Sequence, residues 1–281
     1  MKPAAAQRPR ARASRPAAPD IIAVQGLTKA FGAFTAVDGV SFTVRAGEIF
    51  AFLGPNGAGK TTTIKMLTTL LKPDSGRITI DGHDAATDQD GVRRSFGIVF
   101  QDPSLDDELT ARENMELHAV LYGVPQDRLQ ARVTEMLAFV DLLDRAGSMV
   151  KTFSGGMKRR LEIARGLLHK PKILFLDEPT VGLDPQTRNH IWDYIQKLNR
   201  DEGITIFLTT HYMDEADRVA GRVAIIDHGK ILVQETPARL KASTRTKTLE
   251  DAFIKLTGHG IRADEASGTD QLRAHRRLWR R

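Results

Sequence analysis

The stretch EIFAFLGPNGAGKTTTIKML, residues 48–67, decides the fold. Its apolar opening predicts a strand that is covered on both faces. The next eight residues, GPNGAGKT, fit the phosphate-loop pattern G-x-x-x-x-G-K-[ST], and an amphipathic helix follows. In this pattern the glycines turn backbone N–H groups toward a phosphate, Lys60 reaches the outer phosphates and Thr61 offers its hydroxyl to Mg²⁺. The stretch therefore predicts an α/β domain that binds a nucleotide.

Further strands are predicted on both sides of a long helical segment. Residues 104–170 are dominated by helical periodicity and contain no convincing strand, and TLEDAFIKLTG near the end is predicted as a short amphipathic helix. We therefore expect an α/β core that is interrupted by a helical insertion. The predicted strands are IIAVQGL (21–27), VSFTV (40–44), GRITIDG (76–82), SFGIVFQ (95–101), KILFLDEP (172–179), TIFLTTH (205–211) and RVAIIDHGKILVQE (222–235).

Composition and charge narrow the classes of function. The chain of 281 residues has no cysteine, so disulfides and thiolate chemistry are excluded. No apolar run approaches the roughly 18 residues of a membrane span, and residues 1–20 lack the apolar segment of a secretory signal. The net charge of +6 is concentrated at the two ends, which are rich in arginine. These ends are predicted to be disordered arms, with contact to anionic lipid as the alternative, and a nucleic-acid surface on the remainder is not indicated.

Four polar side chains follow predicted strands. Asp177 ends the apolar run ILFL and can hold Mg²⁺ through water, while Glu178 is the better candidate for polarising an attacking water. Gln101 and His211 end two other strands, at the sheet edge where open α/β sheets bind their ligands. Together with Lys60, these residues predict a phosphate-hydrolysing site.

A second helix start, in KTFSGGMKRRLEIARG (151–166), has the features of an anion-binding site. Ser154 can cap the helix, and Gly155 and Gly156 allow its backbone to approach a phosphate. This segment lies about a hundred residues after the phosphate loop. The sequence therefore predicts two anion-binding helix starts in one chain.

From about Ile21 to Leu256 the chain closely resembles the ATP-binding subunits of ABC transporters. GPNGAGKTT resembles the Walker A motif, ILFLDE the Walker B motif and FSGGM the family's signature motif. Gln101 resembles the Q-loop glutamine, VGLD the D-loop and His211 the switch histidine. FSGGMKRRLEIARGLL, EPTVGLDP and LEDAFIKLTG further resemble the drug-resistance export branch, such as daunorubicin-resistance ATPases.

The resemblance implies the fold and the domain limits. We expect a P-loop NTPase of the α/β class, in which a RecA-like core sheet with flanking helices carries an inserted α-helical subdomain and an antiparallel β part. The expected divisions are a disordered basic arm at 1–20, the cassette at 21–240 with its helical subdomain at about 104–170, and a C-terminal helix with a basic tail at 241–281.

The resemblance also implies a Mg²⁺-dependent ATPase that pairs with a second ATPase subunit. In this family the signature segment of one subunit faces the phosphate loop of the other, so two ATP molecules join the two chains. Separate multi-span membrane subunits would carry the cargo, with this chain bound peripherally at the cytoplasmic face of the cell membrane and no nucleic-acid partner. The implied catalytic residues are Glu178, His211 and Gln101, the metal-binding residues are Thr61, Gln101 and Asp177, and the ATP-binding residues are Phe31, Gly54, Pro55, Asn56, Gly57, Ala58, Gly59, Lys60, Thr61, Thr62, Ser154, Gly155, Gly156 and Asp184.

Three positions depart from the family pattern. Phe153 and Met157 flank the Ser-Gly-Gly where the common motif reads L-S-G-G-Q, and the adenine-stacking aromatic is Phe31 rather than tyrosine, with Phe34 as a rival.

Two other functions stay open. One is an ABC-type ATPase that acts on ribosomes or DNA, although such members usually have two cassettes or a long coiled coil. A binding-only regulatory module would be expected to lack the carboxylate of Glu178.

Overall fold

The computed structural model describes residues 18–258, and the predictions for the two basic ends lie largely outside this range. A six-stranded sheet with the order β10-β9-β3-β8-β7-β6 forms the centre. Five neighbouring strands are parallel, and β10 pairs antiparallel with β9 at the edge. All residues of β3, β7 and β8 are buried, as their apolar sequences predict for strands with both faces covered. The strands are β3 (Ile49–Leu53), β6 (Phe96–Val99), β7 (Ile173–Asp177), β8 (Thr205–Thr210), β9 (Arg222–Asp227) and β10 (Lys230–Glu235).

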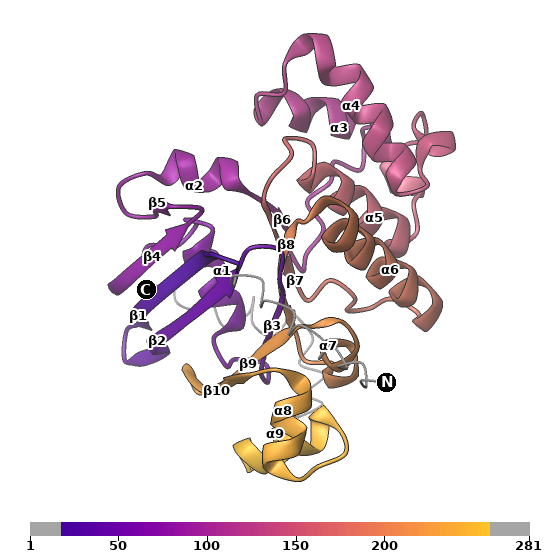
Figure 1. The fold of residues 1–281 in the computed structure, drawn as a ribbon. Helices are drawn as coiled ribbons and strands as arrows, with labels where there is room; N and C mark the ends of the chain where they lie inside the picture. The colour runs from indigo at the N-terminus through magenta and orange to yellow at the C-terminus, as the bar shows by residue number, and fades with distance from the viewer. Residues whose placement is uncertain (1–17, 259–281) are drawn as a thin grey trace, which may run out of the picture.

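A second, antiparallel sheet covers one face of the first. Its order is β2-β1-β4-β5, and helix α1 (Lys60–Leu67) lies between the two sheets (Figure 1). Ile64, Met66 and Leu67 of α1 share a buried cluster with phenylalanines of β3 and with apolar residues of this second sheet. The packing fixes the start of α1 at the carboxyl end of β3. The strands are β1 (Asp20–Phe31), β2 (Phe34–Arg45), β4 (Ser75–Ile80) and β5 (His83–Asp84).

Helices cover the opposite face of the six-stranded sheet (Figure 1). Leu161 and Ile163 of α5 and Trp192 of α6 belong to a second buried cluster, which also includes residues of β3, β7 and β8. Helices α5 (Gly155–Gly166), α6 (Pro185–Glu202) and α7 (Met213–Val219) lie nearest the sheet. Helices α3 (Ala111–Leu121) and α4 (Gln126–Phe139) pack against α5 farther from the sheet (Figure 1), with short 3₁₀ turns at Leu143–Arg145 and Val150–Thr152. The remaining helices are α2 (Gln89–Ser95), α8 (Pro237–Thr244) and α9 (Leu249–Thr257). No helix within residues 18–258 has both the length and the apolar character needed to cross a bilayer.

The α/β fold class is confirmed, while several predicted element limits are wrong. The apolar residues between Ile64 and Leu71 predict that the helix after the phosphate loop continues to Pro73, but it ends at Leu67, since Thr69 adopts a left-handed conformation with φ of 60°. The segment predicted as one strand over 222–235 is a hairpin, because His228 and Gly229 both have positive φ and form its two-residue turn. The strand predicted to end at Gln101 ends two residues earlier, at Val99.

Candidate functional site

The phosphate loop connects β3 to α1, and close backbone packing requires its glycines. Gly57 and Gly59 have φ of 79° and 107°, a region that favours glycine. A Cβ at Gly54 would lie 2.3 Å from the carbonyl oxygen of Ile226, and one at Gly59 would lie 2.4 Å from that of Ala36. Any larger residue would therefore displace the loop from the neighbouring backbone.

The loop presents backbone donors at the start of α1. Gly59 is the N-cap, and no side chain caps the helix there. The first N–H groups of a helix have no partner within it, so those of Lys60, Thr61 and Thr62 are available to an anion. Asn56 and Gly57 are exposed at the tip of the loop, whereas Ala58 is buried. This arrangement fits the outer phosphates of a nucleotide.

Lys60 places its ammonium group between the loop and a carboxylate. Its Nζ donates to the carbonyl oxygens of Gly54 at 2.8 Å and Pro55 at 3.2 Å. The same nitrogen lies 3.1 Å from Oε1 of Glu178, and both side chains are only 6% exposed. The two predicted residues are thus brought together as a buried ion pair.

Asp177 lies at the end of β7 beside two hydroxyl groups. Its Oδ1 accepts hydrogen bonds from Thr209 Oγ1 at 2.6 Å and from Thr61 Oγ1 at 3.3 Å. Burial raises the pKa of the Asp177 carboxyl, and the bonds from Thr209 and Thr61 oppose that rise. Carboxylate and hydroxyl oxygens suit Mg²⁺, which usually completes its coordination with phosphate oxygens and water. Within residues 18–258 no group of three or more His, Cys, Asp or Glu residues could form a metal site from side chains alone.

Glu178 and His211 are joined directly. Nδ1 of His211 lies 2.9 Å from Glu178 Oε2, and the backbone N–H of His211 donates to the same oxygen at 3.3 Å. Burial alone would raise the pKa of the Glu178 carboxyl, but the hydrogen bond with His211 and the charge of Lys60 outweigh it, so this pKa lies below its ordinary value. Glu178 itself has φ of 50°, and its N–H donates to Thr209 Oγ1 at 3.0 Å. A partly exposed histidine thus holds the carboxylate in a fixed, ionised form.

Gln101 is not brought into this cluster. It is exposed in the loop after β6, and among the described residues no hydrogen bond or ion pair joins its side chain to Thr61 or Asp177. Its carbonyl oxygen instead accepts a hydrogen bond from Arg159 NH2 at 3.0 Å. Arg159 was not among the predicted site residues, because its burial and its partners depend on the fold and are not evident from the sequence.

The second helix start belongs to the opposite layer. Ser154 is the N-cap of α5, and its Oγ accepts from the N–H of Met157 at 3.3 Å. Gly155 is exposed, while a Cβ at Gly156 would lie 2.3 Å from Thr187 Cγ2 at the start of α6. Because α1 and α5 pack on different faces of the central sheet, the two helix starts do not form one site within the chain.

The remaining predicted nucleotide contacts lie at two exposed points. Asp184 is the N-cap of α6, and its Oδ1 accepts from the N–H groups of Gln186 at 3.1 Å and Thr187 at 3.0 Å. Phe31 and Phe34 face each other across the β1–β2 hairpin and are 51% and 60% exposed. Both rings are therefore accessible to a base, and the choice between them stays open.

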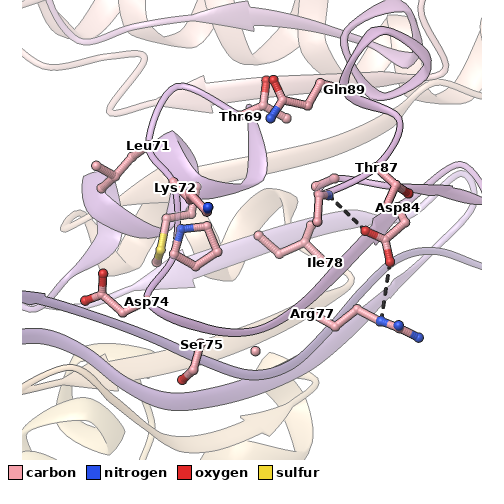
Figure 2. A pocket seen from close by; sticks show the side chains of 15 residues that line it. Thr69, Leu71, Lys72, Asp74, Ser75, Arg77, Ile78, Asp84, Thr87 and Gln89 are labelled. Carbon is pink, nitrogen blue, oxygen red and sulfur yellow. Dashed lines mark hydrogen bonds and ion pairs between the residues drawn. The ribbon is translucent and has the colours of Figure 1, made fainter.

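A separate cavity of about 470 Å³ lies between the end of α1, β4 and the segment that leads into α2 (Figure 2). In it Arg77 Nε pairs with Asp84 Oδ2 at 3.3 Å, and Leu71, Lys72 and Ile78 also line the cavity. None of the residues predicted from the motifs lines this cavity, so it is not the phosphate site.

Comparison with known proteins agrees with the motifs found in the sequence. A family model described as "ABC transporter" matches residues 37–181. The daunorubicin/doxorubicin resistance ATP-binding protein DrrA of Streptomyces peucetius is 45% identical over 228 residues, which are 81% of this chain and 69% of that protein. The linearmycin resistance ATP-binding protein LnrL of Bacillus subtilis is 41% identical over 241 residues, covering 86% of this chain and 76% of that protein.

Two solved structures have the same fold. An ATP-binding subunit of an ABC transporter superposes with a TM-score of 0.76 at 30% identity, covering 84% of this chain and 99% of that one. The dimeric cassette MJ0796, in a post-hydrolysis state bound to ADP and Pi, gives a TM-score of 0.69 at 30% identity and covers 76% of this chain and 98% of that one.

Proposed function

This chain belongs to the ABC transporter family as an ATP-binding and ATP-hydrolysing subunit of the drug-resistance exporter branch, and we propose how its residues perform that work. Glu178 acts as the general base, with His211 orienting it, and Lys60 holds the outer phosphates of ATP. Thr61 and Asp177 would hold Mg²⁺, with Gln101 joining them once its loop approaches the nucleotide, and the metal would offset the negative charge of the phosphates. The observation that carries this proposal is the cluster in which Glu178 forms an ion pair with Lys60 and a hydrogen bond with His211.

Two chains share each ATP in this proposal. The phosphate loop and the Ser154 helix start lie in different layers of one chain, so a second copy or a close homologue would supply the second anion-binding group. Ser154, Gly155 and Gly156 of one subunit then contact the γ-phosphate on the other, with Asp184 beside them at the start of α6. Phe31, or its neighbour Phe34, stacks on the adenine.

Dimerisation in the Glu178→Gln background tests the shared sites. Since this variant keeps the shape of the side chain but removes the base, ATP should hold it as a dimer in sedimentation experiments. Adding Ser154→Arg should abolish dimerisation while the monomer still binds ATP. Ser243→Arg, on an exposed position of α8, is the matched control and should dimerise normally. A Glu178→Gln chain that stays monomeric with saturating ATP, with and without its membrane partner, would overturn the proposal.

The partner in transport is a separate multi-span membrane subunit, and α3 offers a surface for it. Leu117, Val120 and Leu121 are 48%, 60% and 69% exposed, and their spacing places them on one face of the helix. Exposed apolar stripes of this kind favour a protein contact. The chain would then lie peripherally at the cytoplasmic face of the cell membrane. Leu121→Glu should weaken recovery with the membrane subunit and leave the ATPase activity of the isolated chain intact.

The cargo is a drug, lipid or other hydrophobic small molecule moved outward. This rests on relatives whose names concern resistance to daunorubicin, doxorubicin and linearmycin and the export of Nod factor. Cells that express the chain with its membrane subunit should retain less of a fluorescent anthracycline than cells carrying Glu178→Gln. Equal retention would exclude that class of cargo.

A further inference from the structure

Helix α5 carries three buried charged side chains beyond its N-terminal Ser-Gly-Gly. Arg159, Glu162 and Arg165 are 6%, 1% and 6% exposed, although charged residues are rarely buried without a partner. Their spacing of three residues keeps them near one another along the helix. Most of their hydrogen-bond partners lie in one short loop.

That loop, residues 100–104, follows β6 and carries Gln101. Arg159 donates to the carbonyl oxygen of Phe100 through NH1 and to that of Gln101 through NH2 at 3.0 Å. Glu162 accepts from the N–H of Ser104 at 2.8 Å and from Arg159 NH1 at 3.1 Å. The backbone on both sides of Gln101 is therefore tied to α5.

Arg165 adds a second tie at the far end of the loop. It donates to the carbonyl oxygen of Ser104 at 2.7 Å and also to the Ser104 hydroxyl. Bonds with a charged partner are stronger than neutral ones, and a guanidinium fork restricts orientation as well as distance. The loop thus has little freedom to move separately from α5.

We propose that Arg159 is a positioning residue that couples the two ATP sites of the dimer. This rests on the proposed function, in which Ser154 at the start of α5 touches the nucleotide held by the other chain, while Gln101 acts at the chain's own nucleotide. Only five residues, about 7.5 Å of helix, separate Ser154 from Arg159. A shift of α5 when Ser154 meets a phosphate therefore moves the Phe100–Gln101 carbonyls with it. ATP bound at one site thereby changes the placement of Gln101 at the other.

The neighbouring arginine supplies a matched control. Arg160 NH1 donates to the carbonyl oxygen of Val140, at the end of α4, at 2.9 Å. It is the same residue type on the same helix with a backbone partner outside the 100–104 loop. Arg160→Gln removes a comparable bond but leaves the tie to Gln101 intact.

A spin label at Asp102→Cys tests the coupling, because the chain has no cysteine and this exposed loop position then accepts a single label. The labelled chain also carries Lys60→Ala, so it does not hold ATP on its own phosphate loop. It is mixed with an excess of unlabelled Glu178→Gln chain. ATP can then affect the label only through the site that combines the unlabelled chain's phosphate loop with the labelled chain's Ser154.

ATP should change the mobility of this label when Arg159 is present, and equally so with Arg160→Gln. With Arg159→Gln the label should be more mobile before ATP is added and its response should be smaller, because only the bonds of Glu162 and Arg165 to Ser104 then tie the loop to α5. In otherwise unmodified chains Arg159→Gln should lower kcat at least tenfold, while the monomer's Kd for ATP stays within twofold. Arg159→Lys keeps the charge but cannot span two carbonyls, so it should recover part of the response.

Sedimentation of the same mixtures separates the possible failures. If ATP forms no mixed dimer, the shared-site function is wrong and the coupling is overturned with it. If the mixed dimer forms but the parent label does not respond, or responds alike with Arg159→Gln and Arg160→Gln, the coupling alone is overturned. Where circular dichroism shows that Arg159→Gln does not fold, the same comparison between Arg159→Lys and the parent decides.

Discussion

Replacing Glu178 with glutamine should make the monomer bind ATP more tightly, even though it abolishes hydrolysis. In the structure Lys60 forms an ion pair with Glu178, with 3.1 Å between Nζ and Oε1. An incoming γ-phosphate must compete with this carboxylate for the ammonium group and also approach its negative charge. Glu178→Gln removes the negative charge and leaves only a weaker, neutral acceptor for Lys60, while keeping the size of the side chain.

The size of the effect follows from the geometry of the pair. At 3.1 Å the Coulomb attraction is about 5 kcal/mol for an effective dielectric constant of 20, and the cost of removing both charges from water offsets most of it. Hydrogen bonds to charged groups contribute about 1.5–3 kcal/mol net. Lys60 keeps its bonds to Gly54 and Pro55, so we take the lower end, about 1.5 kcal/mol. This corresponds to roughly tenfold tighter binding.

The assay is titration with a fluorescent ATP analogue in the Ser154→Arg background, where dimerisation contributes nothing to the measured Kd. Glu215→Gln is the matched control, because Glu215 is also buried, at 3% exposure, but pairs with Arg188 instead of Lys60. AMP, which lacks the outer phosphates, should bind both variants alike. An unchanged or weaker ATP affinity in Glu178→Gln would show that Lys60 is not held by this carboxylate in solution.

Three further outcomes are expected. Lys60→Ala should weaken ATP binding, and EDTA should stop turnover in the unmodified protein, both measured by phosphate release; undiminished hydrolysis without divalent metal would contradict the site. Burial, followed by the charge of Arg165, lowers the pKa of His118 to about 4. The unfolded chain takes up this proton near pH 6.5, whereas the folded chain does not until about pH 4. The free energy of unfolding should therefore fall as the pH drops from 6.5 to 4, by roughly 1–2 kcal/mol after discounting partial exposure. His118→Gln should remove this loss in urea titrations. Gly97→Ala should destabilise the fold by about 1–3 kcal/mol, since its Cβ would lie 2.0 Å from a backbone oxygen of α5, whereas Gly147→Ala, with nothing within 4 Å, should be nearly neutral.

Much of the site could be predicted because it depends on local order along the chain. Asp177 and Glu178 follow directly after a buried apolar run, and His211 follows another. Neighbouring parallel strands end at the same edge of a sheet, so recognising the strands was enough to bring these side chains together. The phosphate loop needed only its own glycines and the strand and helix on either side.

The missed features depend on parts of the chain that are distant in sequence. Arg159 bonds carbonyl groups 58 and 59 residues away, and no local pattern indicates which backbone a buried arginine will reach. The carbonyl groups of Phe100 and Gln101 bond to Arg159 and not to a neighbouring strand, and β6 ends at Val99, two residues before the predicted end at Gln101. The His228–Gly229 turn was predictable in principle, because adjacent residues with positive φ suit a two-residue hairpin, but the continuous apolar pattern on both sides suggested a single strand.

Two adjacent carboxylates thus acquire opposite properties from their surroundings. Asp177 is buried among hydroxyl groups, which donate single hydrogen bonds and carry no charge, so burial dominates and its pKa rises. Glu178 is buried as deeply, but Lys60 and His211 lie against its two oxygens, so its pKa falls. Burial disfavours the charge of Asp177, and a nearby cation would offset that cost, so its surroundings suit a metal ligand. Glu178 is ionised and can accept a proton, but its lowered pKa makes it a weaker base. Its position between Lys60 of the phosphate loop and His211, and not its basicity, therefore favours Glu178 for the water.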